Sequence, residues 1–543
     1  MSARTPSGGS FLGIDFGTTT SLVAWGRPVD GARGVEPVVL TVPQDGLDTP
    51  ADHLPTLLYF PTSRKVVIGE AAREQLGLRP DRVVRRLKQL LGRFPRIAVV
   101  GRAYATVDLA AAVLKRLRRA AETALGCAPK EAVITVPASF DATRRRALLD
   151  AADAAGFAIG PHTLLDEPVA ALAAYLHDRT LRRRAKGELA FDRERTVLLL
   201  DVGGGTSDAC VARVRPAADG LSVELLALSR FTPVGGDDFD ACVARLLNDA
   251  FCARSGLELD ALPKGDRLLF EHRMILTADR VKRELSERPQ AGKEPVARIR
   301  QMFLHGAHHL IERIDRARYA ALVAPLLSDP RGRAPAAPQS VLDAPWDALR
   351  KAGLEPGALD AVLLAGGMAL VPAVQDAVRA SLDRAPLVVP SPVQAIVRGA
   401  VVQHFAVAGG RAGLRPAAPI AAESIGVQTA GGGFHRLIAA GTPLPAHVVE
   451  RSAFAVPEGW GRYVRIPIAE GEDGRPDPAR LLATLALRFP HRVGAGERVT
   501  LEATLDENKM LAVRGYLEHD PSVAAEARLH VGNEDADGPP FDR

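Results

Sequence analysis

Up to about residue 407, the chain alternates short apolar runs with longer segments in which apolar residues recur every three or four positions. The short runs predict buried strands, and the longer spacing predicts helices that pack one face against a core. The strands expected here are Glu131–Val136, Thr196–Asp201 and Ala361–Leu364. The helices expected are Leu109–Leu125, Asp141–Ala155, Pro168–His177, Asp237–Ala253, Leu269–Ser286 and Val371–Leu382. Such alternation is typical of an α/β domain, here spanning 1–407.

The pattern changes after residue 407. Residues 408–419 are rich in Gly, Ala, Pro and Arg, which predicts an interdomain linker. Beyond it, runs of alternating or continuous apolar residues between turn signals predict a small all-β domain at 420–519. The strand segments are 424–438, 463–468, 481–487, 499–505 and 510–516, with Gly431-Gly432-Gly433 among the turn signals. Residues 520–543 are mostly polar or acidic and predict a flexible tail.

Composition limits the class of protein. A chain of 543 residues exceeds one core, and 47% hydrophobic with 24% charged residues is typical of a soluble globular protein. The net charge of +5 comes from arginines spread along the chain, without the interleaved aromatic residues that base stacking needs, so no nucleic-acid partner is expected. The longest uncharged stretch near a motif, Ala361–Val374, is too short to cross a bilayer.

The inserts, cysteines and N-terminus add smaller expectations. The charged segment Leu181–Arg195 and the Pro-rich segment Pro325–Pro338 predict surface loops. The four cysteines are too far apart for a C-x-x-C pair, and buried free thiols are expected. The N-terminus lacks the charged-then-apolar order of a signal peptide. Together these features predict a cytoplasmic protein that does not contact membranes.

Two similar segments carry the chemistry. FLGIDFGTTTSLVAW (11–25) and VLLLDVGGGTSDACV (197–211) each place an aspartate, Asp15 or Asp201, at the end of an apolar run and before a Gly/Thr cluster. Glycines let backbone N–H groups approach phosphate oxygens, and threonine hydroxyls add donors. A carboxylate at each strand end suits hydrated Mg²⁺, which prefers one or two carboxylates, waters and substrate phosphates. The pair predicts two facing turns that clamp a nucleotide's phosphates.

The order of motifs resembles the Hsp70 (DnaK-type) chaperone family, within the superfamily that also holds actin and sugar kinases. The motifs are GIDFGTT (13–19), AVITVPASFDATRRRALLDAA (132–152), LLDEPVAALAAY (164–175), LLLDVGGGTSD (198–208), VGGDDFD (234–240), VLLAGGMALVPAVQDAV (362–378) and QAIVRGAVVQ (394–403). The likeness implies an α/β actin-like ATPase domain with two lobes and duplicated ribonuclease-H-like cores, followed by a substrate-binding β-sandwich.

The resemblance also implies roles for individual residues. The expected magnesium-associated carboxylates are Asp15, Asp201 and Asp208. The expected catalytic residues are Lys88, Glu167, Asp201 and Thr206, with Lys88 near the γ-phosphate. The expected nucleotide-binding residues are Gly17, Thr18, Thr19, Gly203, Gly204, Gly205, Thr206, Gly235, Gly236, Lys282, Arg283, Ser286, Gly366, Gly367 and Leu370. Pro137 and Arg145 match a pair proposed to couple nucleotide state to the second domain. The implied ligands are ATP or ADP with Mg²⁺, and K⁺ as a further ion.

Three regions depart from the family pattern. Gly366-Gly367 is followed by Met368-Ala369-Leu370, where the family has a hydroxyl residue and, two positions on, a base-stacking arginine, so weaker or less base-selective ATP binding is expected. The linker lacks the family's acidic, leucine-rich character and offers little to dock. Only about 25 residues follow the β domain, too few for the family's helical lid. Weak coupling between domains is therefore expected.

Three functions fit these features. The first is an Hsp70-like ATPase, expected to be a monomer, that binds unfolded polypeptide or a dedicated protein partner, together with a co-chaperone. The second is a pseudo-ATPase scaffold that nucleotide stabilises without a chaperone cycle. The third is a small-molecule kinase of the same superfamily, against which TVPASF and the C-terminal β domain argue.

Overall fold

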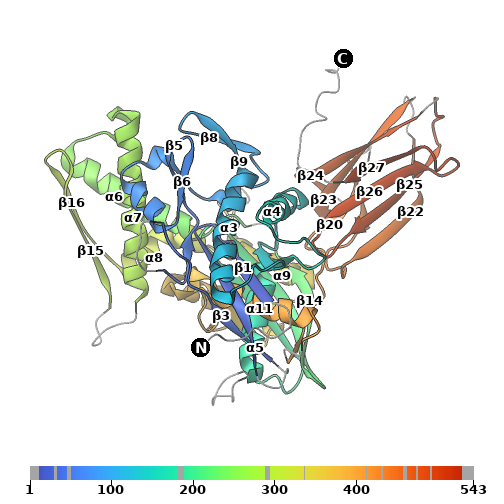
Figure 1. Ribbon diagram of the computed structural model, residues 1–543, viewed down its shortest axis with the longest axis horizontal. Helices are drawn as coiled ribbons and strands as arrows, with labels where there is room; N and C mark the ends of the chain where they lie inside the picture. The colour runs from blue at the N-terminus through green and yellow to red at the C-terminus, as the bar shows by residue number, and fades with distance from the viewer. Residues whose placement is uncertain are drawn as a thin grey trace.

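The structure is a computed structural model. It describes residues 11–29, 34–45, 50–181, 189–230, 232–287, 294–334, 337–410, 413–429, 432–456, 462–472, 475–489 and 492–528. Two six-stranded sheets with covering helices form the α/β part, and a separate all-β part carries the C-terminal strands (Figure 1). No described helix combines the length and the hydropathy that a bilayer crossing requires.

The first sheet has the strand order β11-β10-β1-β2-β3, with β4 also paired to β2. Its strands are β1 (Phe11–Asp15), β2 (Thr20–Val29), β3 (Gly34–Val39), β4 (Leu54–Pro55), β10 (Val133–Val136) and β11 (Leu164–Asp166). Strands β1, β10 and β11 are parallel, whereas β2 and β3 are antiparallel additions. Helices α3 (Thr106–Leu125) and α4 (Ala142–Ala154) share a buried core with one face of this sheet.

The second sheet repeats this order as β18-β17-β12-β13-β14, and adds β19 at the edge. Its strands are β12 (Arg195–Val202), β13 (Ser207–Ala217), β14 (Gly220–Leu228), β17 (Ala361–Ala365), β18 (Leu387–Val388) and β19 (Leu414–Arg415). Here β12, β17 and β18 are parallel, and β13 and β14 are antiparallel. One face is covered by α6 (Gly236–Ser255), α7 (Lys264–Ser286), α8 (Arg316–Val323), α9 (Asp343–Ala352) and α10 (Pro372–Leu382).

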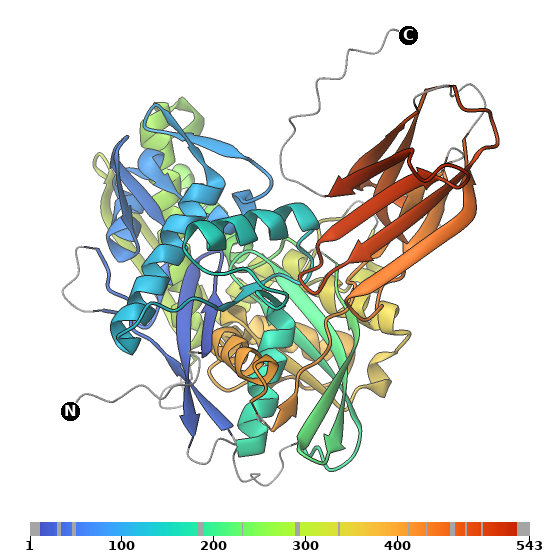
Figure 2. The same cartoon turned by 45° about the vertical axis from the view of Figure 1, so that its right-hand side comes forward.

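Helices α5 (Glu167–Leu181) and α11 (Ala395–Val407) lie between the two sheets (Figure 2). They share one buried core with residues of both sheets, among them Ala24 and Leu199. The helices approach closely at Gly399, where a Cβ atom would overlap the carbonyl oxygen of Ala170. This contact ties the two sheets into one α/β body, because both pack on the same helix pair.

Smaller elements surround the sheets. On the first-sheet side they are β5 (Leu58–Thr62), β6 (Lys65–Ile68), α1 (Glu70–Glu74), β7 (Val83–Val84), α2 (Leu87–Leu90), β8 (Arg96–Val99) and β9 (Arg102–Ala105). On the second-sheet side, β15 (Val296–His305) and β16 (His308–Asp315) form a two-stranded sheet. Short 3₁₀ turns complete this part at 75–77, 80–82, 259–261, 324–327, 330–332, 356–358 and 367–370.

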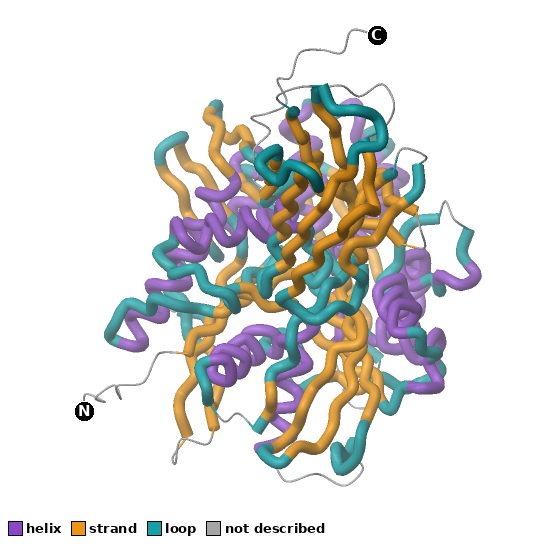
Figure 3. Tube along the Cα trace, turned by 90° about the vertical axis from the view of Figure 1, so that its right-hand side faces the viewer, coloured by secondary structure: helices purple, strands orange, loops and turns teal. Residues whose placement is uncertain are grey.

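The all-β part is a sandwich of two four-stranded sheets, in the orders β21-β20-β23-β24 and β22-β25-β26-β27. Its strands are β20 (Ser424–Gln428), β21 (Phe434–Ile438), β22 (Ala446–Ala455), β23 (Tyr463–Glu472), β24 (Arg475–Arg488), β25 (Arg498–Leu505), β26 (Leu511–Leu517) and β27 (Ala524–Arg528). Inward-facing apolar residues of both sheets form its core, with Ile468, Leu487 and Leu501 fully buried. Figure 3 turns this part toward the viewer.

The expected helices and strands of the α/β part are present with shifted ends: α4, α10 and β10 are shorter than expected, and the others are longer. The six expected helices correspond to α3, α4, α5, α6, α7 and α10, and the three strands to β10, β12 and β17. Strand β27 lies within 520–543, which the sequence assigned to a flexible tail, because its backbone pairs with β26 as an antiparallel edge strand. Residues 182–188, Gly431 and 529–543 lie outside the described residues. Cys127 is exposed, contrary to expectation, whereas Cys210 is buried.

Candidate functional site

The two Gly/Thr turns face each other in the α/β part. The first turn joins β1 to β2, and the second joins β12 to β13. A Cβ atom on Gly204 would lie 2.7 Å from Thr19 Oγ1, and one on Gly205 would lie 3.0 Å from Thr18 Cγ2. Glycine is therefore required for the tips to come this close, and the facing arrangement expected from the sequence is present.

Four acidic residues and one lysine gather beside the turns. Asp15 ends β1, and Asp201 lies in β12 opposite Asp208 in the β12–β13 ladder. Glu167 begins α5 and forms an ion pair with Lys88 of α2. All five side chains are buried. The cluster therefore draws on four separate segments of the chain, which the motif order alone does not place together.

The carboxyl groups of the cluster raise one another's pKa values. Burial, followed by the charge of Glu167, raises the pKa of Asp15 to about 7. The same two causes, in the same order, raise the pKa of Asp208 to about 7 and that of Asp201 well above its usual range. Lys88 offsets only part of this effect. The cluster therefore has an excess of buried negative charge that a bound cation would relieve.

Two carboxylate oxygens of this cluster, Asp201 Oδ1 and Asp208 Oδ2, are buried without a hydrogen-bond partner among the described residues. Outside the cluster, Asp240 Oδ1 is in the same condition. Neighbouring oxygens are satisfied, since Thr135 Oγ1 donates to Asp15 Oδ1 at 3.1 Å and Ser139 Oγ to Asp208 Oδ1 at 3.0 Å. In the described part of the chain, no three His, Cys, Asp or Glu side chains converge as an all-protein metal cage. This donor set fits hydrated Mg²⁺, which keeps its waters and binds few carboxylates.

Glycines outside the second turn pack closely against it and against Asp201. Gly203 N donates to Thr206 O at 3.0 Å, which closes the turn. Gly236 N, at the start of α6, donates to Gly203 O at 3.0 Å. A Cβ atom on Gly235 would lie 2.6 Å from Gly205 N, and one on Gly366 would lie 2.5 Å from Asp201 Oδ1. Gly366 also has φ of 79°, a left-handed conformation that favours glycine.

Helix α7 supplies three of the expected nucleotide-binding residues, and within the described part of the chain only Lys282 of the three makes a polar contact outside this helix. Lys282 Nζ donates to Asp240 Oδ2 at 2.8 Å and to Gly236 O at 3.4 Å. Arg283 pairs at 3.0 Å with Asp279 of its own helix, and Ser286 Oγ donates to Lys282 O at 2.7 Å. Lys282 is thus joined to the start of α6, whereas the contacts of Arg283 and Ser286 remain within α7.

Met368, which follows the Gly366-Gly367 pair, and Lys282 both lie close to Gly236. A Cβ atom on Gly236 would lie 3.1 Å from Met368 Sδ and 3.3 Å from Lys282 Nζ. A Cβ atom on Gly367 would meet no atom within 4 Å, and Leu370 is 45% exposed. Of the two apolar replacements, the buried Met368 therefore lies near Lys282, whereas Leu370 is exposed.

Contacts between the first-sheet and second-sheet sides were not identified from the sequence. Gln89 Nε2 donates to Gly205 O at 3.1 Å, and Arg86 Nε donates to Asp237 Oδ2 at 2.5 Å. Arg73 also lies 3.4 Å from Asp279. Gln89 and Arg86 flank Lys88, so their position beside the expected lysine was the available signal.

The residue before Glu167 links the site to the sandwich. Arg145 Nη2 donates to Asp166 Oδ1 at 2.7 Å, and Lys509 Nζ donates to Asp166 Oδ2 at 2.6 Å. Arg145 also donates to Pro137 O at 3.3 Å, so the expected Pro137–Arg145 pair is in contact. Burial alone would raise the pKa of Asp166, but Lys509 and Arg145 bring it below its usual range. Burial lowers the pKa of Lys509 to about 8.

Part of the expected linker is docked on the second sheet, contrary to the expectation that this segment offers little to dock. Leu414 and Arg415 pair with Leu221 and Ser222 as the parallel edge strand β19, and Leu221 N donates to Gly413 O at 2.9 Å. The Leu414 side chain is buried in the core around α5 and α11. The sequence prediction failed because backbone pairing needs no acidic residues and a single leucine fills the available space.

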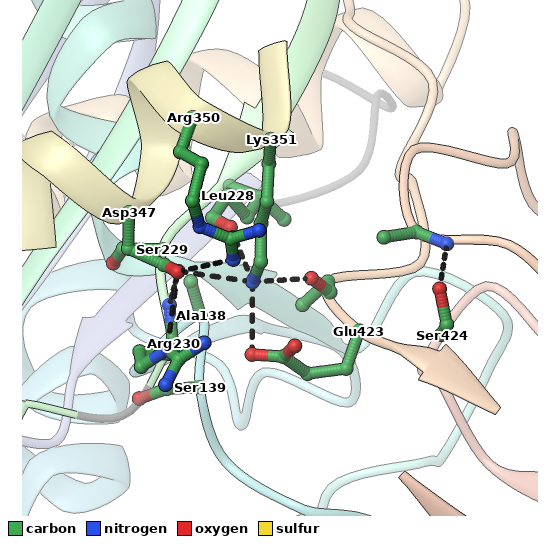
Figure 4. A network of polar contacts seen from close by, with 12 residues as sticks. Ala138, Ser139, Leu228, Ser229, Arg230, Asp347, Arg350, Lys351, Glu423 and Ser424 are labelled. Atoms are coloured by element: carbon green, nitrogen blue, oxygen red, sulfur yellow. Dashed lines mark hydrogen bonds and ion pairs between the residues drawn. The ribbon is translucent and has the colours of Figure 1, made fainter. Parts of the chain in front are cut away.

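A second contact lies just after the linker (Figure 4). Lys351 Nζ donates to Glu423 Oε1 at 2.8 Å and to Ala422 O at 2.9 Å. On the α/β side it donates to Leu228 O at 3.2 Å and pairs with Asp347 at 3.1 Å. The start of the sandwich is therefore bound to α9 and to the end of β14.

Comparison with known proteins gives one consistent result. Residues 94–518 match the family model described as "Hsp70 protein". The chain is 29% identical over 471 residues to the chaperone protein DnaK of Thermosipho melanesiensis, a match that covers 85% of this chain and 70% of the relative. It is 28% identical over 468 residues to the chaperone protein DnaK of Thermotoga neapolitana, with the same coverage.

Proposed function

Because the chain belongs to the Hsp70 family, we propose that it is a molecular chaperone that binds and hydrolyses Mg-ATP between its two Gly/Thr turns. The observation that carries this proposal is the buried cluster in which Asp201 Oδ1 and Asp208 Oδ2 lack hydrogen-bond partners among the described residues. A buried carboxylate oxygen left without a partner is unfavourable unless a ligand completes it.

Each cluster residue has a distinct role in this proposal. Asp15 and Asp201, with Asp208 beside them, would hold a hydrated Mg²⁺ that would neutralise negative charge on the phosphates, and K⁺ is a further candidate ion. The backbone N–H groups of 17–19 and 203–206 bind the phosphates. Lys88 stabilises the charge that develops on the transferred phosphoryl group. Glu167 and Thr206 orient the attacking water, and ADP and phosphate leave without a covalent intermediate.

The proposal extends to the architecture. The repeated strand order of the two sheets supports two lobes with duplicated ribonuclease-H-like cores over 1–407. We assign 408–419 as the linker and 420–519 as the substrate-binding β domain, to which β27 adds an edge strand. This domain binds unfolded polypeptide or a dedicated protein partner, and a co-chaperone assists the cycle.

We expect contacts to the base to contribute less to nucleotide affinity than contacts to the phosphates. Met368 lies near Lys282 and Leu370 is exposed, so apolar side chains stand at these positions and neither offers a guanidinium to stack on a base. Loss of one such cation–π partner weakens binding by about 1 kcal/mol. Calorimetry in Mg²⁺ buffer therefore should show ATP and GTP binding with similar affinities. Failure of ATP, GTP and ADP to bind would contradict the nucleotide site itself.

Phosphate release from Mg-ATP, measured with and without an unfolded peptide, tests the proposed function. The expected result is slow release that the peptide changes, because the sandwich contacts Asp166 directly before Glu167. Thermal stabilisation by Mg-ATP without phosphate release would indicate a pseudo-ATPase scaffold instead. Transfer of phosphate to a small-molecule acceptor would indicate a kinase.

A further inference from the structure

The outer face of the β15–β16 sheet is basic. This sheet lies at the opposite end of the molecule from the sandwich (Figure 1). Its inner residues, which include Ile299 and Leu310, are buried against α6 and α7. On the outer face Arg298, Arg300 and Arg313 are exposed to solvent. The sheet therefore presents a row of arginines on a rigid support.

The register places like charges directly opposite each other. Arg298 pairs with Arg313 in the antiparallel ladder, and Arg300 pairs with Ile311. Directly opposed like charges destabilise an antiparallel pair. Among the described residues, no carboxylate forms an ion pair with Arg298, Arg300 or Arg313. The three positive charges of this face are therefore not neutralised within the described part of the chain.

The nearest acidic residues have other partners. Glu312 points inward, where it pairs with Arg254 at 2.9 Å and with Arg318 at 3.1 Å. Asp315 is exposed at the end of β16 and accepts a hydrogen bond from Arg318 N at 2.9 Å. Glu312 pairs with Ile299 in the ladder, so its side chain lies on the opposite face from Arg300, and Asp315 lies at the end of β16 opposite Val296. Glu294, just before β15, pairs with Arg316.

A cavity adjoins this face between α7 and β15. It has a volume of about 500 Å³, and its lining includes the charged Arg273, Arg280 and Arg300 and the apolar Leu276, Met302 and Leu304. The lining contains no carboxylate. Arg273 Nε donates to the carbonyl of Gly77 at 3.3 Å, and Arg280 lies 3.8 Å from Glu284. Met302 is 56% exposed and the neighbouring Ile311 is 48% exposed.

We propose that this face and its cavity bind an acidic segment of a partner protein that carries one apolar anchor residue. The carboxylates of the segment bind Arg298, Arg300 and Arg313, because a guanidinium matches a carboxylate with two parallel hydrogen bonds. The anchor enters the cavity against Leu276 and Met302. Charge complementarity selects this occupant, and the apolar contacts favour a peptide over a phosphate backbone. The cavity lining offers no aromatic ring for base stacking.

Fluorescence anisotropy of the full chain tests the proposal. The probe is a fluorescein-labelled peptide with alternating glutamates around a central leucine, compared with the same peptide in which glutamine replaces glutamate. The acidic peptide should bind, and its affinity should fall as salt is raised, because exposed charges are screened. The glutamine peptide should bind at least about tenfold more weakly, which corresponds to the loss of one charge-assisted hydrogen bond.

Variants localise the binding. The double substitution Arg300→Gln and Arg313→Gln should lower the affinity for the acidic peptide at least about tenfold. Met302→Glu should lower this affinity by a similar factor. The matched control is Arg119→Gln, which changes an exposed arginine of α3. This variant should bind the acidic peptide as tightly as the unaltered chain does. Equal binding by the double variant and the control, or no binding by the unaltered chain, would overturn the proposal. The proposal would also be overturned if single-stranded DNA displaced the peptide and bound more tightly than the peptide does.

Discussion

Lys509 Nζ lies 2.6 Å from Asp166 Oδ2, and Asp166 is the residue directly before Glu167. The lysine comes from the β25–β26 turn of the sandwich, where its φ is 62°. Next to it, Asn508 Oδ1 accepts from Leu164 N at 3.0 Å and Asn508 Nδ2 donates to Gly160 O at 2.9 Å. One turn of the sandwich thus contacts the backbone and side chains that position the proposed catalytic glutamate.

Lys509→Met should loosen this docking. The substitution keeps the length of the side chain but leaves the buried Asp166 with Arg145 as its ion partner, and breaking a buried pair weakens an interface by about 3 kcal/mol. Small-angle scattering should show a larger radius of gyration than in the unaltered chain. Lys130→Met, an exposed lysine of the same α/β side, is the control and should leave the radius unchanged. An unchanged radius for Lys509→Met would exclude the ion pair as a docking contact.

Leu414→Asp should release the linker. Leu414 is buried while its neighbour Arg415 is exposed, so Arg415→Asp is a control on the same strand. Exposing a buried leucine costs about 2 kcal/mol, and a buried carboxylate adds to that penalty. Limited proteolysis should cleave within 408–419 faster in Leu414→Asp than in Arg415→Asp. Equal cleavage rates would show that β19 is not held by its leucine.

Magnesium binding should depend on pH through the carboxylate cluster. The pKa values of Asp15 and Asp208 are about 7 in the folded chain, against 3.8 for the free side chain. The folded, metal-free chain therefore binds more protons in this window, and its free energy of unfolding falls as pH rises from 3.8 to about 7. A cation must displace these protons, so stabilisation by Mg-ADP should increase over the same window and then level off.

Asp208→Asn separates this effect from general pH sensitivity. Thermal midpoints with and without Mg-ADP, measured across the window, should give a weaker pH dependence for Asp208→Asn than for the unaltered chain. Asp153→Asn changes an exposed carboxylate on α4 and should preserve the original dependence. If Asp208→Asn and Asp153→Asn behave alike, Asp208 does not take part in proton-linked metal binding.

Gly366→Ala should damage the metal side of the site. The added Cβ would lie 2.5 Å from Asp201 Oδ1, and φ at this residue is 79°. Gly353 also has positive φ, 65°, but a Cβ there meets no atom within 4 Å, so Gly353→Ala measures the backbone strain alone. That strain costs about 1–3 kcal/mol of unfolding free energy. Gly366→Ala should lose more stability than Gly353→Ala, together with Mg-nucleotide binding, and equal losses would contradict the close contact.

The sequence predicted local elements better than contacts. The α/β pattern, the helices and the facing Gly/Thr turns follow from apolar spacing and from glycine, which act over a few residues. Strand β27 and the docked linker were missed because edge pairing uses backbone groups that composition does not reveal. Lys509 was missed because a lone lysine in a polar turn has no local pattern, and its partner Asp166 is 343 residues away.

The candidate site was predictable where its residues belong to motifs that resemble the family's. The order of motifs pointed to Asp15, Asp201, Glu167 and Lys88, which the fold brings together. It gave no information on Gln89 and Arg86, whose partners Gly205 and Asp237 lie on the opposite side of the site. It also placed Arg283 and Ser286 with the nucleotide, although their contacts remain within α7.

The central claim is that the cluster around Lys88 hydrolyses Mg-ATP, and single-turnover phosphate release by Lys88→Ala tests it most directly. Loss of one preorganised charge in phosphoryl transfer should slow release about a thousandfold. ATP affinity, measured by calorimetry on the same preparation, should change little, and Lys115→Ala on the exposed side of α3 should match the unaltered chain in both assays. Unchanged phosphate release by Lys88→Ala would contradict the account.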